Sequence, residues 1–409
     1  MNLDRLLKLD SEAIRQEQLP PQKRFLFQQL RETTGRPFVA LLGPRGSGKT
    51  VLLRQLRSQI RDAIYLSADT LESDDRLEDV VRALAERYGI HSFFIDEIHF
   101  IPEYHRGLKE LYDFTEVTLW FTSSVALSLH TSGWDLSRRV QAIQLLPFSF
   151  REYLAFVHGE EFAPLPVDEL LRAEVSPEHL RTSPRFDAYL RGGLYPFMLE
   201  RGAGTDQFGA ILQTVVRRDI PACAPSVTHD DLAKIDKLLH FIGKSPIDGI
   251  NYTSVSRNVG ITTYKAERFI EFLERSFILR RAFPSGTNVL REPKVFMELP
   301  YRVLFRPFEE CVGELREDFF ALAMAQHGMP FSYAKTTRGS KTPDFILELS
   351  TGTVVLEVGG RGKGRSQFKG LRYDAKVVLS HGDDLRAAAG LRVPLHCLGF
   401  APQNPSSST

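Results

Sequence analysis

Eight residues near the N-terminus have the types and spacing of a phosphate-binding loop. They follow a hydrophobic run at 37–42 and precede a helical run at 51–56, so a strand, a glycine-rich turn and a helix succeed one another. In that context G-x-x-x-x-G-K-[ST] directs backbone N–H groups and a helix N-terminus at one anion. The alternative is a structural turn that matches by chance. The predicted ligand-binding residues are Gly43, Pro44, Arg45, Gly46, Ser47, Gly48, Lys49, Thr50 and Val51.

The ligands that this loop predicts are ATP and Mg²⁺. Lys49 would reach the β- and γ-phosphates, and the Thr50 hydroxyl would take one coordination position of the metal.

Two carboxylates end a buried strand further along the chain. The mostly apolar residues 92–95 lead into Asp96 and Glu97. Buried parallel strands carry their polar groups at the carboxyl end, where α/β sheets bind ligands. We therefore predict that Asp96 holds Mg²⁺ through water and that Glu97 polarises the attacking water. The alternative is the start of a helix, because acidic residues are common in first turns.

The next strand, predicted at 117–121, ends in three hydroxyl residues at 122–124. In nucleoside-triphosphatases with an additional central strand, that end carries a polar residue that senses the γ-phosphate. Ser124 is the first candidate for this role and Thr122 the second. A serine that caps a helix at 125–127 is the alternative.

Composition limits the class of protein. The 409 residues predict two to four domains, and the net charge of +1 means that any nucleic-acid surface must be a local patch. Three distant cysteines argue against a disulfide framework or a zinc site and fit a reducing cytoplasm. There is no secretory signal and no apolar run of about 18 residues, so we expect a cytoplasmic protein without a membrane span.

Several motifs together resemble one family. The motifs are Gly43-Pro44-Arg45, the FFIDE strand at 93–97, Arg138-Arg139-Val140 leading into 146–154, Gly-Gly-Leu-Tyr-Pro at 192–196 and Val-Arg-Arg-Asp-Ile at 216–220. This combination is similar to AAA-type ATPases of bacteria and archaea related to the signal-transducing (STAND) branch. Members of that family end in a domain of unknown function that resembles a restriction nuclease.

The resemblance implies an arginine at the γ-phosphate. The family usually has Gly where Ser123 stands and Gly-Arg where Arg138-Arg139 stands. Arg139 therefore matches the arginine, which would approach the γ-phosphate in cis or from a neighbouring subunit of an oligomer. The alternative is a solvated arginine beside a strand.

The expected fold class is α/β, with a P-loop NTPase of the additional-strand (AAA/STAND-like) type and three further modules. We place the ATPase domain at 1–150, a helical lid at 151–225, a winged helix-turn-helix at 226–300, a PD-(D/E)xK nuclease-like domain at 301–400 and a disordered tail at 401–409. The lid would begin with a helix opened by the capping box Ser149-Phe150-Arg151-Glu152. A longer lid helix is expected from about 206 to 218. The arginines at its end, Arg217 and Arg218, would face phosphate or Asp219, or form a solvated helix end, which we favour.

The winged helix-turn-helix would bind DNA or protein. Thr262, Thr263, Tyr264, Lys265 and Arg268 would enter the major groove, and Arg280 and Arg281 in the wing would contact phosphate. Three glutamates on the same helix, at 267, 271 and 274, leave a protein-contact or structural role equally open.

The C-terminal module predicts a pair of facing carboxylates. A hairpin loop at 350–351 places Asp344 opposite Glu357 and puts alternate residues of 345–349 and 354–358 on one buried face. Two carboxylates that lie so close together would need a cation beside them. The arrangement resembles the PD-(D/E)xK core, with Glu317 as its helical acid, but the lysine expected two residues after Glu357 is Gly359. We therefore favour a degenerate nuclease fold, with Lys363 or Lys341 as the alternative source of an amine.

A basic run follows this hairpin. It is opposed by one acid, Asp374, and is a candidate phosphate-contact surface or a solvated loop. The first functional hypothesis is an ATP-hydrolysing switch or motor that acts on DNA. The second is a nucleotide-controlled protein-interaction switch, and the third is an active ATP-regulated nuclease. The basic residues are Arg361, Lys363, Arg365, Lys369, Arg372 and Lys376.

Overall fold

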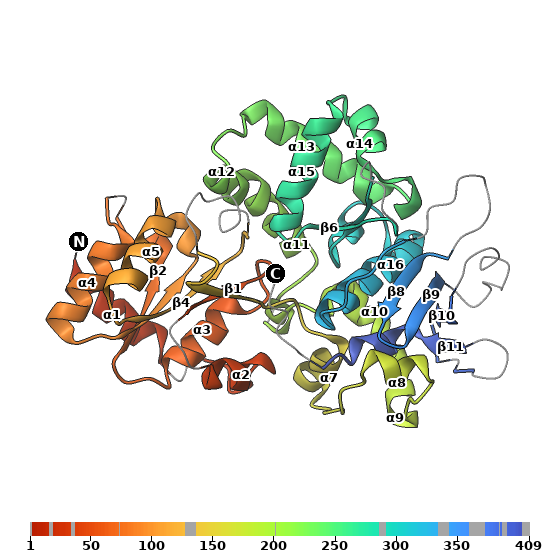
Figure 1. Ribbon diagram of the computed structural model, residues 1–409, viewed down its shortest axis with the longest axis horizontal. Coiled ribbons are helices and arrows are strands. Elements are labelled where there is room, and N and C mark those ends of the chain that lie inside the picture. The colour runs from red at the N-terminus through yellow and green to blue at the C-terminus, as the bar shows by residue number, and fades with distance from the viewer. Residues whose placement is uncertain are drawn as a thin grey trace. The chain divides into compact units, whose positions relative to one another are not determined.

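The chain forms two compact units in the computed structural model (Figure 1). The N-terminal unit contains residues 1–147 and 217–227, and the C-terminal unit contains 148–216 and 228–404. The structure describes residues 2–15, 19–33, 37–72, 74–126, 136–200, 202–285, 292–333, 343–359, 373–383, 385–386 and 391–402.

The N-terminal unit is built on five parallel strands in the order β2-β3-β4-β1-β5. Four of the strands are buried along most of their length, as expected for a sheet covered on both faces. Strand β4 lies between β1 and β3, so one strand separates the strand before the phosphate loop from the strand that ends at Asp96. The predicted parallel α/β architecture is therefore confirmed. The strands are β1 (Phe38–Leu42), β2 (Ala63–Ser67), β3 (Ser92–Asp96), β4 (Thr118–Ser123) and β5 (Val140–Gln144).

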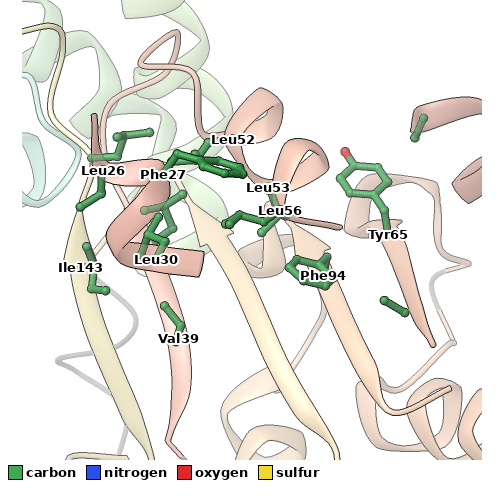
Figure 2. Packing of buried hydrophobic residues seen from close by; sticks show 14 residues of the cluster. Leu26, Phe27, Leu30, Val39, Leu52, Leu53, Leu56, Tyr65, Phe94 and Ile143 are labelled. Atoms are coloured by element: carbon green, nitrogen blue, oxygen red, sulfur yellow. The ribbon is translucent and has the colours of Figure 1, made fainter. Parts of the chain in front are cut away.

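One face of this sheet is covered by α2 and α3 (Figure 2). Leucines at helical spacing on α3, such as Leu52 and Leu56, pack with Phe27 of α2 over side chains of the strands. This packing fixes the direction in which α3 leaves the phosphate loop. The helices of the unit are α1 (Leu3–Ala13), α2 (Leu26–Glu32), α3 (Lys49–Arg57), α4 (Leu77–Tyr88), α5 (Tyr104–Phe114) and α12 (Ile220–Cys223).

The first part of the C-terminal unit is helical. Helix α7 begins as predicted, with the Ser149 side chain accepting a hydrogen bond from the Glu152 N–H at 3.1 Å. At Gly192 the backbone has φ 127°, and a Cβ there would lie 2.7 Å from the Phe208 ring, so both conformation and space require glycine. The helices are α7 (Phe150–His158), α8 (Val167–Leu171), α9 (Pro177–Leu180), α10 (Phe186–Ala188) and α11 (Asp206–Thr214).

Three further helices precede a two-stranded antiparallel sheet. Helix α13 (His229–Lys244) has a capping box at Thr228, and α14 (Tyr252–Val259) ends at Gly260 in the left-handed conformation. Helix α15 (Thr263–Arg275) follows, and then β6 (Leu279–Ala282) pairs with β7 (Lys294–Met297).

The last elements are α16 (Phe308–Gln326) and a four-stranded sheet in the order β11-β10-β9-β8. Phe345 pairs with Leu356, so Asp344 precedes β8 beside Glu357, and the predicted register is correct. The predicted face is buried at all of its positions except Leu349, and the opposite face is buried too, at Ile346 and Val355. The strands are β8 (Phe345–Leu349), β9 (Gly352–Gly359), β10 (Ala375–Ser380) and β11 (Leu391–Pro394).

The predicted division into four modules and a tail stays a prediction. By its contacts, the chain from 228 onward forms one unit with 148–216, whereas 217–227 belongs to the N-terminal unit. Among the described residues, no helix combines the length and apolar character that a bilayer crossing requires.

A fully buried ion pair joins two parts of the C-terminal unit. The Arg302 guanidinium donates to Asp318 on α16 at 2.7 Å and 3.2 Å, and to the backbone oxygen of Ile242 on α13 at 2.9 Å. Asp318 also accepts from the Met297 N–H of β7 at 3.0 Å. Burial raises the pKa of Asp318, and the Arg302 charge opposes that shift. The pair therefore links α13, β7 and α16 inside one core.

Removing one partner should strongly destabilise this unit. We expect Asp318→Ala to lower the free energy of unfolding by about 3–5 kcal/mol, because it leaves a buried guanidinium without its counter-charge. The matched control is Glu309→Ala on the same helix, which breaks an exposed ion pair with Arg191. Denaturant unfolding followed by circular dichroism measures both. Similar midpoints for the two variants would contradict the assignment.

Candidate functional site

The phosphate loop is shaped by glycines at the carboxyl end of β1. A Cβ at Gly43 would overlap the backbone oxygen of Leu145, which follows the neighbouring strand β5. Gly46 and Gly48 have φ values of 80° and 89°, which side-chain-bearing residues rarely adopt. The loop therefore folds tightly between the sheet and the first turn of α3, as its sequence predicts.

Lys49 lies over this loop with its ammonium buried. Its Nζ donates to the backbone oxygens of Gly43 at 2.9 Å and Pro44 at 3.0 Å, and the residue is 4% exposed. Burial lowers the pKa of Lys49, and the carboxylates of Glu97 and Asp96 oppose that shift. The hydrogen-bond acceptors of the ammonium are thus neutral backbone oxygens. An anionic phosphate oxygen would form a stronger hydrogen bond with it and would displace them.

Asp96 is fixed at the end of β3 by two hydroxyl donors. Tyr65 on β2 donates to one carboxylate oxygen at 2.9 Å, and Thr122 on β4 donates to the other. Each oxygen keeps a second lone pair. Asp96 and the hydroxyl of Thr50, the second residue of α3, are the oxygen donors that Mg²⁺ prefers, and few protein ligands suffice for this ion. The residues present therefore fit a Mg²⁺ site of the phosphate-loop type.

Glu97 occupies a left-handed backbone position with φ 50°, unusual for a residue with a side chain. Its backbone N–H donates to the Thr122 hydroxyl at 2.9 Å, and its carboxylate accepts from the Ser124 N–H at 3.1 Å. Burial alone would raise the pKa of Glu97. The charges of Lys49 and Arg45, with the Ser124 N–H, reverse the shift and hold that pKa below its ordinary value. The side chain is thus an anchored, ionised carboxylate.

Both hydroxyl candidates on β4 lie at this end of the sheet. Thr122 contacts Asp96 and the Glu97 backbone, whereas Ser124 contacts Glu97 through its N–H and Asp219 through its hydroxyl at 3.4 Å. No helix at 125–127 can be assessed, because residue 127 lies outside the described residues. The sensor role of Ser124 stays a prediction.

His99 is a site residue that sequence reasoning missed. Its Nδ1 lies 3.4 Å from the Glu97 carboxylate and 3.1 Å from the Ser123 hydroxyl. Burial lowers the pKa of His99, and the charge of Glu97 opposes that shift. A single histidine two residues after Glu97 was the available signal, but it carries no spacing pattern that marks it as functional.

Asp219 is a second site residue that sequence reasoning did not identify. The two arginines before it are exposed, as the predicted solvated helix end requires, whereas Asp219 itself is fully buried. It accepts two hydrogen bonds from Arg45 of the phosphate loop, from Nε at 2.6 Å and Nη2 at 2.7 Å. The neighbouring Arg218 instead lies over the Phe100 ring at 4.2 Å. Only the fold could bring Asp219 to a loop 174 residues earlier in the chain.

Arg139 lies at the opposite end of the sheet. Its backbone oxygen accepts from the N–H of Phe38, the first residue of β1, so it stands at the amino ends of the strands. Its guanidinium donates to both oxygens of Asp113 at 2.9 Å and 3.0 Å. An approach to the γ-phosphate in cis is therefore wrong, since β1 separates Arg139 from the phosphate loop. An approach from a neighbouring subunit stays a prediction.

The second predicted acidic site is less complete. Asp344 accepts from the Val358 N–H at 2.8 Å, and Glu357 beside it is fully buried. Within the described part of the chain, no group of three or more His, Cys, Asp or Glu side chains is suited to a metal ion. The alternative amines Lys341 and Lys363 lie outside the described residues, as does most of the basic run.

Comparison with known families agrees with the first site. Residues 35–154 match the family described as an AAA domain, and residues 183–297 match a domain of unknown function (DUF8612). No curated protein matches the sequence. Together with the loop and the sheet order, the first match identifies an AAA-type P-loop ATPase domain in the N-terminal unit.

Solved structures give weaker similarities. The Aeropyrum pernix ORC1 protein in complex with DNA is 13% identical, with 76% of this chain and 97% of that chain covered and a TM-score of 0.32. AMPPCP-bound DnaA from Aquifex aeolicus is 16% identical, with 61% of this chain and 86% of that chain covered and a TM-score of 0.24. PCH-2 from C. elegans is 15% identical, with 64% of this chain and 67% of that chain covered and a TM-score of 0.24. At TM-scores this far below 0.5, none of them bears on the function of this chain.

Proposed function

We propose that this protein is a Mg²⁺-dependent ATPase whose nucleotide state controls its C-terminal unit. The observation that carries the proposal is the position of Glu97. Its ionised carboxylate is anchored by the Ser124 N–H and lies in the charge field of Lys49, at the carboxyl end of the sheet. A fixed acceptor beside a phosphate loop is the element that orients a water molecule for attack on a γ-phosphate.

The roles of the other residues follow from their contacts. Lys49 exchanges the Gly43 and Pro44 oxygens for the β- and γ-phosphates of ATP, because a charge-assisted hydrogen bond is stronger than a neutral one. Thr50 and Asp96 would hold Mg²⁺, which would neutralise charge on the phosphates. Tyr65 and Thr122 keep the Asp96 carboxylate oriented. Glu97 accepts a hydrogen bond from the attacking water.

Two substitutions test this assignment. We expect Lys49→Ala to lose ATP binding, because the loop loses its only ammonium. Glu97→Gln should still bind ATP but lower kcat by about 10²–10⁴-fold, since an amide is a poor general base. Release of phosphate and binding of a fluorescent ATP analogue measure the two properties. The control is Glu116→Gln, which removes an exposed carboxylate just before β4 at the other end of the sheet. Turnover that survives Glu97→Gln would exclude the role of Glu97.

The Arg45–Asp219 pair supports a switch. Arg45 belongs to the phosphate loop and lies 3.9 Å from Glu97 as well as in contact with Asp219. A bound triphosphate adds a competing anion for its guanidinium. If Arg45 turns to the phosphate, the buried Asp219 loses its partner at a cost of about 3–5 kcal/mol unless its segment moves. That segment, 217–227, continues at both ends into the C-terminal unit.

Hydrogen exchange can detect this movement. We expect a non-hydrolysable ATP analogue to speed amide exchange in 217–227 of the wild type. In Arg45→Ala, exchange there should be fast already and independent of nucleotide, because the pair is absent. Arg87→Ala, which removes an exposed arginine at the end of α4, should behave like the wild type. Unchanged exchange in the wild type at saturating nucleotide would count against the switch.

Action on DNA is the first candidate output, through the winged helix-turn-helix at 226–300 and the nuclease-like domain at 301–400. Tyr264, Lys265 and Arg268 are exposed on α15, as a recognition helix requires. The predicted wing contacts are not supported: Arg280 pairs with Glu298 at 2.6 Å, and Arg281 with Glu274 at 2.5 Å. These inward-paired arginines favour the second candidate, a protein-interaction switch, which the 65% exposed Tyr264 ring also fits.

Salt dependence separates the two outputs. If the protein acts on DNA, the logarithm of the binding constant should fall linearly with the logarithm of salt concentration. Arg268→Ala should reduce the slope by about one, and joint replacement of Lys363, Arg365 and Lys369 by Gln by about three. Arg87→Ala in the N-terminal unit is the control. No binding at low salt would leave the protein-interaction switch. Plasmid cleavage abolished by Glu357→Ala would instead support the nuclease.

A further inference from the structure

The N-terminal unit contains a cavity whose lining does not include the phosphate loop. Its volume is about 500 Å³, and it lies at the carboxyl end of β2, between α1 and α3. Leu6, Leu9 and Ala13 of α1 form an apolar wall. Arg54 of α3 and Tyr65 of β2 also line the cavity. The volume is in the range of small-molecule sites, which combine an apolar wall with few polar groups.

Arg54 is the residue that indicates the charge of a ligand. Its guanidinium stacks on the Tyr65 ring at 4.8 Å and donates to the Tyr65 hydroxyl through Nη2 at 3.3 Å. Its Nε is buried without a hydrogen-bond partner, and no described carboxylate forms an ion pair with it. A partly buried guanidinium with one long hydrogen bond to a neutral hydroxyl is poorly compensated.

A neighbouring arginine shows what compensation looks like in this unit. Arg57, one turn further along α3, donates to both oxygens of Asp10 at 3.0 Å and 2.6 Å. Asp10 also accepts from the Tyr65 N–H at 2.6 Å, so α1, α3 and β2 are tied together just below the cavity. Arg54 has no such carboxylate. Among the described residues, Arg57 thus has a carboxylate partner, whereas Arg54, which lines the cavity, does not.

The remaining lining sets the charge balance. Arg15 adds a second positive charge, and Glu12 opposes one of the two, so the cavity keeps an excess of positive charge. Because the lining combines the Arg54 guanidinium with the apolar side chains of α1, the cavity suits a ligand with a charged end and an apolar body. The Tyr65 hydroxyl also donates to Asp96, so the cavity and the predicted Mg²⁺ carboxylate share one side chain.

We propose that this cavity binds a small amphipathic anion. Its carboxylate, sulfonate or phosphate group contacts the Arg54 guanidinium, and its apolar body packs on Leu6, Leu9 and Ala13. The site is separate from the phosphate loop and does not depend on ATP hydrolysis.

The probe for the test is 8-anilinonaphthalene-1-sulfonate, an aromatic sulfonate whose fluorescence rises on binding. Titration in the presence of saturating ADP keeps the nucleotide site filled. We expect saturable binding of one probe per chain, weakened at least tenfold by Arg54→Ala. Arg61→Ala, which removes an exposed arginine four residues beyond Arg57, is the matched control and should bind like the wild type. Leu9→Glu, at a partly exposed position of the apolar wall, should also weaken binding. This variant tests the proposal by itself if Arg54→Ala does not fold.

Three outcomes would overturn the proposal. The first is the absence of saturable binding in the wild type. The second is displacement of the probe by ADP, which would place it in the nucleotide site. The third is an unchanged dissociation constant in a folded Arg54→Ala variant, or in Leu9→Glu.

Discussion

Burial of charge at one edge of a parallel sheet is the constraint on which the candidate site depends. Lys49, Asp96 and Asp219 are each less than a tenth exposed. A buried charge is tolerated only with hydrogen bonds or a counter-charge. Lys49 donates hydrogen bonds to backbone oxygens, Asp96 accepts them from two hydroxyls, and Asp219 forms an ion pair with Arg45. Tyr65 and Thr122 are distant in sequence from Asp96, and Arg45 is distant from Asp219, so these contacts form only when the sheet is assembled.

Strand β4 is central to this arrangement because it lies between β1 and β3. Residues at and just after its end contact the end of β3, since Thr122 reaches Asp96 and the Ser124 N–H reaches Glu97. On the other side, the Gly43 N–H of the phosphate loop donates to the Ser123 oxygen at 3.3 Å. With β4 inserted, the phosphate loop and the acidic pair are one strand apart. That gap is the space in which a γ-phosphate and a water molecule would lie. The same edge continues to β2, where Tyr65 connects Asp96 to the cavity around Arg54.

The C-terminal unit uses charge differently. Its fully buried pair, Arg302 and Asp318, links α13, β7 and α16 inside one core. The arginines of β6 are likewise neutralised by glutamates of the same unit. Charged residues that looked available in the sequence are therefore partly structural. This makes a basic composition on a strand weak evidence for nucleic-acid contact, since an internal carboxylate competes for the same guanidinium.

The sequence by itself determined the local features whose physics acts over a few residues. The glycine loop, the strand that ends in Asp96 and Glu97, the Ser149 cap and the register of Asp344 against Glu357 all depend on short-range geometry.

Only the tertiary structure decided which distant side chains meet. Asp219 is joined to Arg45, Arg139 lies at the wrong end of the sheet for a cis role, and Arg281 points to Glu274. Long-range ion pairs leave no periodic signal in a sequence, because their partners are selected by packing and by the need to neutralise buried charge. The strand order β2-β3-β4-β1-β5 sets which of those charges share an edge.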